Sequence, residues 1–214
     1  MEIIPAILPK NLDELTEKLA RVPRDAKTVH IDFTLSEQEN LARFTHSEMG
    51  SDTAKDFLAR FAQLFLLEAH LMMPHPQEHI AGLVAAGFAR VIVQCEALSP
   101  EAFAEMIHEW RGSVEIGVSL ALSAPLDALA SFAHEVTTIQ LMAIAAIGSQ
   151  GQPFDVRVIP RIRELHRRYP RHIISVDGGV NKENAAALVD AGAGRLVVGS
   201  AISDFYGASA RTKD

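Results

Sequence analysis

Short apolar runs rich in β-branched residues alternate along this chain with longer stretches of helical periodicity. The apolar runs have the length of strands, and they lie at Ile3–Leu8, Thr28–Phe33, Leu66–Met72, Arg90–Cys95, Val114–Leu120, Val136–Met142, His172–Asp177 and Arg195–Gly199. The stretches between them carry apolar residues three or four positions apart, which is the spacing of one helix face. Eight alternating strand–helix units, the last with a short helix, predict a parallel sheet.

Three of the intervening stretches show clear helical faces. These faces are Leu12, Leu15 and Leu19; Ala54, Phe57, Leu58, Phe61 and Leu64; and Ala185, Leu188 and Val189. Pro160 lies in the stretch after Phe154. Because proline is tolerated only in the first turn of a helix, this helix is predicted to begin near residue 160 or to be kinked there.

Eight such units in a chain of 214 residues predict an α/β protein with a single (β/α)8 TIM-barrel domain over residues 1–214. Active sites of such barrels lie at the C-terminal ends of the strands. The alternative is an open doubly wound sheet, which usually has fewer strands and a glycine-rich first turn. Here the first turn reads Leu8-Pro9-Lys10-Asn11 and contains no glycine, which favours the barrel.

Composition excludes several classes of function. Apolar residues make up 48% of the chain, so a large core can form. The net charge is −7 and no long basic run occurs, which argues against a nucleic-acid partner bound by phosphate neutralisation. No apolar run approaches the length of a membrane span. The single cysteine, Cys95, excludes an internal disulfide and, with no signal peptide in the sequence, predicts a cytoplasmic protein.

Polar residues occupy strand positions that should be apolar in a barrel. In the second strand, side chains alternate between faces, so His30 and Asp32 share the face opposite Ile31. Both faces of a barrel strand are dry, and inward polar groups must be paired or bind something. For this pair alone, a hydrogen bond between the two side chains explains the pattern equally well.

The pattern recurs on two further strands. Glu68, His70 and Met72 share one face of the third strand, and Ser175 and Asp177 share one face of the seventh. Three strands therefore direct two imidazoles and two carboxylates toward one axis; these belong to His30, Asp32, His70 and Asp177. Such a nitrogen and oxygen set suits Zn²⁺, Fe²⁺ or Mn²⁺.

Glycines follow the last two strands. Gly178 and Gly179 precede a helix for which Asn181 is a candidate N-cap, and Gly199 and Ser200 follow the eighth strand. Phosphate sites of (β/α)8 barrels are commonly built from these two loops, where backbone N–H groups are accessible. Either loop alone is also explained as a tight turn; the pair favours a phosphate site.

These residues resemble those of the ribulose-phosphate 3-epimerase family, over most of the chain. The most specific segments are His30-Ile31-Asp32, His70-Leu71-Met72 and Val176-Asp177-Gly178-Gly179-Val180-Asn181. The resemblance implies a ribulose-phosphate-binding (β/α)8 barrel that acts as an isomerase on a small sugar phosphate. It also implies assembly into a homo-oligomer.

The resemblance implies a role for each matching residue. One divalent metal ion is held by His30, Asp32, His70 and Asp177, and Asp32 and Asp177 also form the acid–base pair that inverts C3 of D-ribulose 5-phosphate to give D-xylulose 5-phosphate. The remaining matches are residues that line the substrate, Met72 and Met142, and residues that hold its phosphate, Gly178, Gly179, Gly199 and Ser200.

The sequence departs from the family pattern where the sugar would lie. Ala6 replaces a serine, Phe33-Thr34-Leu35-Ser36 replaces a stretch with Met-Asp-Gly, Gln94 replaces a histidine, Ala121-Leu122 replaces Asn-Pro, and Ala146–Gln152 replaces a glycine-rich mobile loop. These changes leave open an epimerase of another ketose phosphate, such as a ketohexose 6-phosphate, or a non-catalytic sugar-phosphate-binding barrel.

Two other functions are disfavoured. Decarboxylases and aldolase-type members of the superfamily carry Asp-x-Lys-x-x-Asp at a strand end, whereas this chain has His30-Ile31-Asp32 without the lysine. A purely structural barrel would have to explain four inward polar residues. The polar segment Ser36–Asp52 has no assigned role.

Overall fold

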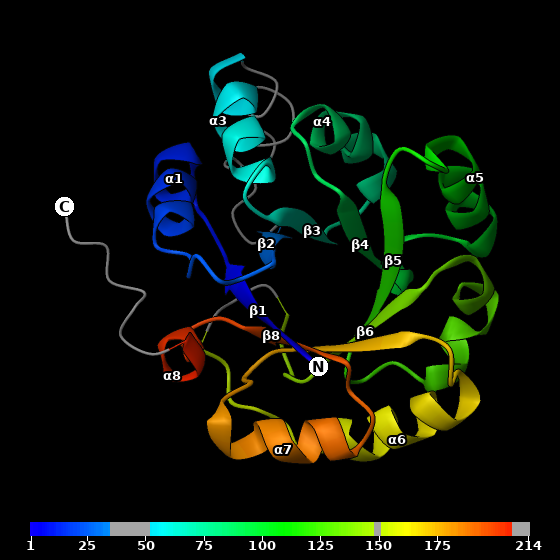
Figure 1. Ribbon diagram of the computed structural model, residues 1–214. Helices are drawn as coiled ribbons and strands as arrows, with labels where there is room; N and C mark the ends of the chain where they lie inside the picture. The colour runs from blue at the N-terminus through cyan, green and yellow to red at the C-terminus, as the bar shows by residue number, and fades with distance from the viewer. Residues whose placement is uncertain (35–51, 148–150, 207–214) are drawn as a thin grey trace.

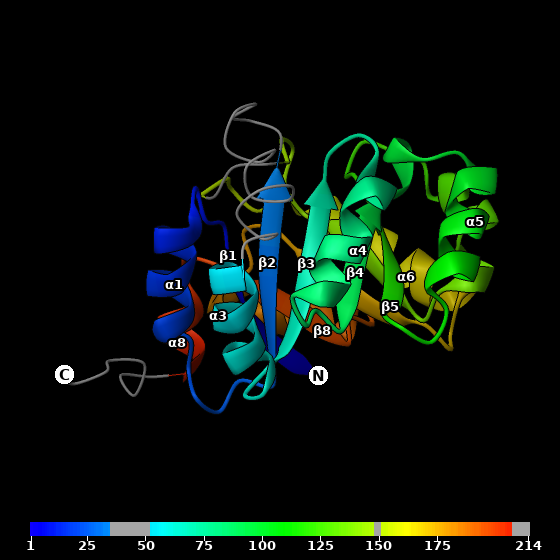
Figure 2. The same cartoon turned by 90° about the horizontal axis from the view of Figure 1, so that it is seen from above.

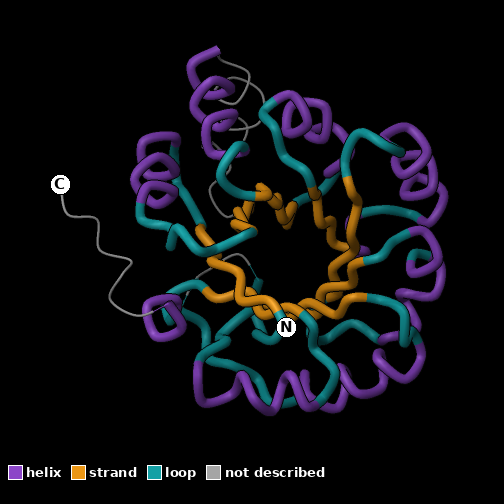
Figure 3. The backbone as a smooth tube through the Cα atoms, viewed as in Figure 1, coloured by secondary structure: helices purple, strands orange, loops and turns teal. Residues whose placement is uncertain are grey.

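The computed structural model describes residues 1–34, 52–147 and 151–206. Its strands are β1 (Glu2–Ile7), β2 (Thr28–Thr34), β3 (Leu66–Met72), β4 (Arg90–Gln94), β5 (Glu115–Leu120), β6 (Thr138–Met142), β7 (Ile173–Asp177) and β8 (Arg195–Val198). Each strand pairs in parallel with the next, and β1 pairs with β8, so the sheet closes. Figures 1 and 3 show the ring of strands inside a ring of helices. The predicted (β/α)8 barrel is confirmed, and the open sheet is excluded.

The helices that cover the barrel are α1 (Leu12–Ala20), α3 (Asp52–Ala62), α4 (Ile80–Ala85), α5 (Pro100–Trp110), α6 (Val158–Arg168), α7 (Lys182–Asp190) and the short α8 (Ile202–Tyr206). Figure 2 shows α1, α3, α4 and α5 running alongside the strands. None of the helices in the described ranges is both long and apolar enough to cross a bilayer.

The connection from β5 to β6 differs from the others. It consists of two 3₁₀ segments, Leu126–Ser131 and Ala133–Glu135, in place of an α-helix. Shorter 3₁₀ turns, Pro76–His79 and Cys95–Ala97, precede α4 and α5. The 3₁₀ segments still cover the barrel, because Phe132 between them is buried and packs edge-on against Phe103 of α5, with ring centroids 4.9 Å apart.

Two sequence predictions about helices have different outcomes. α6 begins at Val158, so Pro160 lies in its first turn, where a missing N–H costs nothing. The prediction that Leu64 belongs to a helical face is wrong, because α3 ends at Ala62 and Leu64 is 69% exposed. The Phe61 carbonyl accepts hydrogen bonds from the backbone N–H of both Leu64 and Phe65. This turn buries Phe65 instead, which is 7% exposed.

The other predicted helical faces pack as expected where their side chains are described. Buried or partly buried residues of these faces are Leu15, Leu19, Phe57, Leu58, Phe61, Ala185, Leu188 and Val189. The side chains of Leu12 and Ala54 lie outside the described part.

The barrel interior is unusually polar. TIM-barrel interiors are commonly filled by branched apolar side chains, but here many buried residues are polar or charged: His30, Asp32, Glu68, His70, Gln94, Ser119, Gln140, Ser175, Asp177 and Arg195. The apolar core lies instead between the sheet and the helices, where Val29, Ile31 and Phe33 of β2 are at most 1% exposed. A buried polar interior is tolerated only when its groups are hydrogen-bonded or hold a ligand.

Candidate metal and acid–base centre

The four residues predicted as ligands meet at one point. His30, Asp32, His70 and Asp177 each offer one ligand atom, and these atoms all lie within 4.8 Å of one another. Asp32 Oδ1 is 3.2 Å from His30 Nε2 and 3.0 Å from His70 Nδ1. Asp177 Oδ2 is 3.6 Å from His70 Nδ1 and 4.0 Å from His30 Nε2. The structure therefore brings the four predicted residues together, and their role as metal ligands stays a prediction.

Strand register brings the cluster together. Asp32 on β2 is level with His70 on β3, and Asp177 on β7 is level with Met142 on β6. Because all strands run in the same direction, the inward residues near their C-terminal ends form one layer. The barrel's curvature then turns β7 toward β2 and β3, so one layer holds residues 145 positions apart in the chain, from Asp32 to Asp177.

Both histidines have a partner on the side away from this cluster. His30 Nδ1 lies 2.6 Å from Glu68 Oε1, and His70 Nε2 lies 3.0 Å from Gln94 Nε2. Each histidine thus has one ring nitrogen held from behind and the other directed at the two aspartates. This is the arrangement in which outer partners fix the orientation of ligating imidazoles.

Gln140 is a site residue that the sequence analysis missed. Its Nε2 lies 3.3 Å from His70 Nδ1 and 3.4 Å from Asp177 Oδ2, and its Oε1 accepts a hydrogen bond from Ser175 Oγ at 3.2 Å. The signal was present, because Gln140 shares the inward face of its strand with Met142, just as His30 does with Asp32.

The two aspartates differ in protonation when no cation is bound. Burial raises the pKa of Asp32, but His30 and His70 outweigh burial and hold that pKa well below its usual range. Burial and the nearby charge of Asp32 raise the pKa of Asp177 to about 6. Burial lowers the pKa of His30, yet Asp32 and Glu68 outweigh it and raise that pKa to about 10. One carboxyl is thus ionised at neutral pH while the other holds a proton more readily, as an acid–base pair requires.

The residues present fit a divalent cation. Two imidazole nitrogens and two carboxylate oxygens converge within the reach of one ion. Gln94 Oε1 is buried and has no hydrogen-bond partner among the described residues. If His70 coordinates through Nδ1, its Nε2 carries the proton and needs an acceptor. A flip of the Gln94 side-chain amide exchanges its oxygen and nitrogen and places Oε1 beside His70 Nε2. The neutral glutamine can therefore accept the hydrogen bond from Nε2 of a ligating His70.

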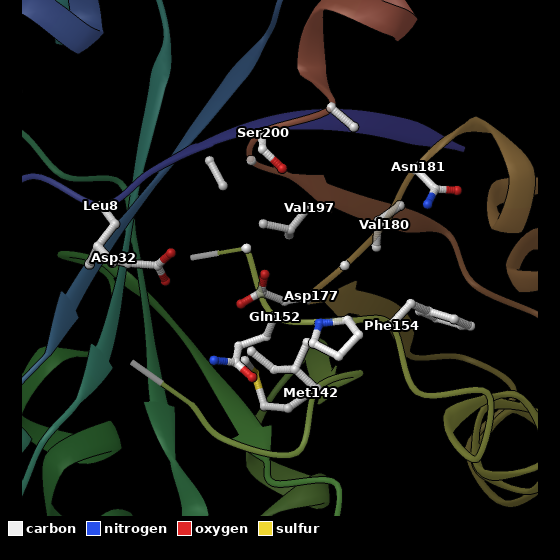
Figure 4. A pocket seen from close by; sticks show the side chains of 18 of the residues that line it. Leu8, Asp32, Met142, Gln152, Phe154, Asp177, Val180, Asn181, Val197 and Ser200 are labelled. Atoms are coloured by element: carbon white, nitrogen blue, oxygen red, sulfur yellow. The ribbon is translucent and has the colours of Figure 1, made fainter. Parts of the chain in front are cut away.

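A cavity of about 260 Å³ opens beside the aspartates. Figure 4 shows Asp32, Asp177 and Met142 around one space, with Ser200 on another side of it. The predicted substrate and phosphate residues all line the cavity: Met72, Met142, Gly178, Gly179, Gly199 and Ser200. The sequence did not assign the further lining residues Leu8, Ile144 and Pro153.

The loop after β7 needs glycine at both predicted positions. Gly178 has φ +112° and Gly179 has φ +64°, backbone conformations that favour glycine. A Cβ on Gly179 would lie 2.6 Å from the backbone nitrogen of Phe154, and one on Gly178 would lie 2.7 Å from Ile144 Cγ2. The loop is therefore pressed against the segment after β6, and both line the cavity.

A capping box anchors this loop to α7. Asn181 Oδ1 accepts from the backbone N–H of Glu183 and of Asn184, and Asn184 Oδ1 accepts from the backbone N–H of Asn181. Asn184 Nδ2 also donates to the Gly179 carbonyl at 3.0 Å. Asn184 therefore holds both ends of the turn from Gly179 to Asn181.

Replacing Asn184 with alanine is expected to raise the apparent KM for a phosphorylated substrate about fivefold to tenfold. The variant loses the side-chain hydrogen bonds that hold the turn, at a cost in binding free energy of about 1 kcal/mol, because the N–H groups of the turn are then less well placed. Steady-state kinetics and thermal unfolding measure this. Glu183→Ala, one position earlier on the same helix turn, is the control and should leave KM unchanged. Equal KM values for the two variants would contradict the anchoring role.

The departures from the family pattern lie partly in the described structure. Ala6 lines the cavity, and Gln94 partners His70. The backbone N–H of Ala121 donates to Glu96 Oε1, and its carbonyl accepts from Arg161. Leu35, Ser36 and residues 148–150 lie outside the described residues, as does all of Ser36–Asp52 except Asp52, where α3 begins.

Fold and site together define the chain as a (β/α)8-barrel protein with a buried His and Asp centre at the C-terminal ends of its strands. Residues 2–203 match the ribulose-phosphate 3 epimerase family, so the chain belongs to that family of isomerases. The predicted resemblance is confirmed, and with it the prediction of an isomerase at the level of the family.

Named relatives agree with this assignment. The chain is 34% identical to ribulose-phosphate 3-epimerase of Bacillus subtilis over 152 residues, 69% of this chain and 68% of the relative. It is 29% identical to the Schizosaccharomyces pombe protein of that name, over 63% of this chain and 58% of the relative. An alignment with the Candida glabrata protein is longer, at 25% identity over 94% of this chain and 85% of the relative.

Solved structures confirm the fold alone. A chain of the tryptophan synthase a2b2 complex from Pyrococcus furiosus is similar with a TM-score of 0.69 at 18% identity, covering 98% of this chain and 92% of that one. A 3-hexulose-6-phosphate synthase is similar with a TM-score of 0.68 at 18% identity, covering 98% of this chain and 96% of that one.

Proposed function

We propose that this protein is a metal-dependent ketose-phosphate 3-epimerase that interconverts D-ribulose 5-phosphate and D-xylulose 5-phosphate. The observation that carries the proposal is the pair Asp32 and Asp177, which reach one cavity from different strands. Inversion at a carbon next to a carbonyl needs one group that removes a proton and another that returns one to the opposite face. Two carboxyls that reach one cavity from different strands support both roles.

The proton balance is simple. The ionised carboxyl of the pair removes the C3 proton, and the electrons of the broken C–H bond move into an enediolate. The protonated carboxyl then delivers its proton to the other face of C3. The two aspartates end with exchanged protonation states, so the same pair serves the reverse reaction.

His30, Asp32, His70 and Asp177 would hold the ion, which is Zn²⁺, Fe²⁺ or Mn²⁺ by its ligand set. When bound, it would polarise the C2 carbonyl and stabilise the negative charge of the enediolate. Met72 and Met142 line the cavity with thioethers, which carry no exchangeable proton. The loops with Gly178, Gly179, Gly199 and Ser200 would hold the phosphate through accessible N–H groups.

Removal of the metal is expected to abolish turnover. Dialysis against a chelator should lower the rate of xylulose 5-phosphate formation at least about 100-fold, because charge stabilisation at a developing oxyanion is commonly worth that much. Readdition of Zn²⁺, Mn²⁺ or, without oxygen, Fe²⁺ should restore it, with about one ion bound per chain by elemental analysis. Full turnover by protein shown to be metal-free would contradict the proposal.

A second candidate is epimerisation of another ketose phosphate. It is favoured by Ala6, which lines the cavity where the family pattern has a serine and leaves one hydroxyl fewer to bind the sugar. Comparing kcat/KM for D-ribulose 5-phosphate and for D-fructose 6-phosphate separates the two candidates. Binding of both with turnover of neither would favour a non-catalytic sugar-phosphate-binding barrel.

A further inference from the structure

Glu68 lies in the barrel interior behind His30, away from the substrate cavity. Its side chain is 0% exposed, and it is level with His30 in the β2–β3 register. One carboxylate oxygen, Oε1, lies 2.6 Å from His30 Nδ1. The other, Oε2, accepts from Arg90 Nη1 at 2.8 Å and from Arg195 Nη2 at 2.6 Å. Both oxygens are therefore engaged, and only one of them faces the His and Asp centre.

The two arginines belong to a wider ion cluster, whose outer members Glu115 and Glu2 are partly exposed. Arg90 also donates to Glu115 at 2.8 Å, and Arg195 Nε lies 3.6 Å from Glu2 Oε2. Arg90 is on the strand beside β3, whereas Arg195 is on β8 and reaches Glu68 through the barrel interior. Among the described residues, the lining of the cavity includes neither arginine nor Glu68. The cluster therefore does not contact a substrate in that cavity.

Stability alone does not account for this cluster. Burying charges costs desolvation free energy, and apolar side chains of similar size often stabilise a core equally well or better. The glutamate carboxylate also does more than neutralise the arginines, because its Oε1 is turned away from them toward an imidazole. His70, the other candidate ligand, has the neutral Gln94 behind it instead. The charged partner is thus specific to His30.

We propose that Glu68 is a positioning residue for the metal centre: it accepts the Nδ1 proton of His30, directs His30 Nε2 at the ion, and is itself held by Arg90 and Arg195. This inference rests on the proposed function. A carboxylate behind a ligating imidazole fixes its tautomer and orientation and increases its basicity as a ligand. Because two arginines donate to Oε2, the orientation of the carboxylate is fixed and Oε1 remains the acceptor for His30 Nδ1.

The substitution Glu68→Gln tests this role. A glutamine has a single carbonyl oxygen, and Arg90 and Arg195, which can only donate, would claim it. Its NH₂ group would then face His30 Nδ1, which favours the tautomer with the proton on Nε2 and opposes coordination there. We expect the affinity for Zn²⁺, measured by competition with a chromophoric chelator, to fall about 10-fold to 100-fold. At saturating Zn²⁺, kcat should fall more than KM changes.

Glu115→Gln is the matched control. It makes the same substitution in the same ion cluster, next to Arg90, Thr137 and Thr138, without contact to His30. We expect it to lower the melting temperature and to leave Zn²⁺ affinity within about threefold of the wild type. Should Glu68→Gln not fold, the double variant Glu68→Gln with Arg195→Gln restores the cluster's net charge and is measured in its place.

The outcomes separate this inference from the proposed function. If the wild type binds Zn²⁺ and Glu68→Gln binds it equally tightly, the positioning role is overturned and the epimerase proposal stays intact. The same conclusion follows if Glu68→Gln and Glu115→Gln lose affinity for Zn²⁺ to the same extent. A wild-type protein that binds no divalent ion would overturn both. A loss confined to Glu68→Gln supports the inference, whether or not the substrate proves to be ribulose 5-phosphate.

Discussion

Replacing Asp177 with asparagine is expected to lower the epimerisation rate about 10²-fold to 10⁴-fold, the range that a positioned acid or base contributes. Asparagine keeps the size of the side chain but can neither accept nor deliver the C3 proton. It also removes one of the four candidate metal donors, so divalent affinity should fall as well. Steady-state rates at saturating metal separate the two effects, because only the proton-transfer loss persists there.

The control for this variant is Asp190→Asn, the same change at the exposed end of α7. It should leave both rate and metal affinity unchanged. The assignment of Asp177 would be contradicted by a variant that turns over at the wild-type rate. Loss of turnover with the fold and metal content intact would support proton transfer as its role.

Replacing Gly179 with valine is expected to weaken apparent substrate affinity about tenfold or more while leaving the metal centre intact. The new side chain would collide with the backbone of Phe154, 2.6 Å from its nitrogen, at a residue with φ +64°. The loop must shift by more than a few tenths of an ångström, and strain at such a position costs about 1–3 kcal/mol. KM and inhibition by inorganic phosphate measure the loss.

Gly112→Val provides a control matched in backbone strain. Gly112 has φ +85°, but a Cβ there would meet no atom within 4 Å. This variant should lose stability in thermal unfolding and keep its KM. If Gly179→Val keeps the wild-type KM as well, the loop after β7 does not hold the phosphate.

Much of the fold and centre could be predicted because strand periodicity is a local signal. Alternation alone placed His30, Asp32, His70 and Asp177 on inward faces, and the parallel order of the strands brought them to one level. The same signal applied to Gln140, but a single polar residue between Ile139 and Leu141 does not indicate a functional site until its contacts to His70 and Asp177 are known.

The ion cluster behind His30 could not be predicted, for a different physical reason. Arg195 opens its strand, a position where a charged residue commonly meets solvent, and its partner Glu68 is 127 residues away. Alternation places Arg195 on the same face as Val197, which lines the cavity, but only the closed barrel brings it to Glu68. Leu64 shows the opposite error: helical spacing continues past Ala62, but the turn that follows the helix directs Phe65 into the core.

The most direct test of the central claim is solvent deuterium incorporation at C3 of D-ribulose 5-phosphate, followed by proton NMR with metal-loaded protein in D₂O. The account predicts that label enters C3 as xylulose 5-phosphate forms, and that Asp177→Asn slows epimer formation about 10²-fold to 10⁴-fold. Label without the epimer would show that one carboxyl works and its opposite partner does not. The absence of both label and epimer would contradict the assignment of this protein as an epimerase of ribulose 5-phosphate.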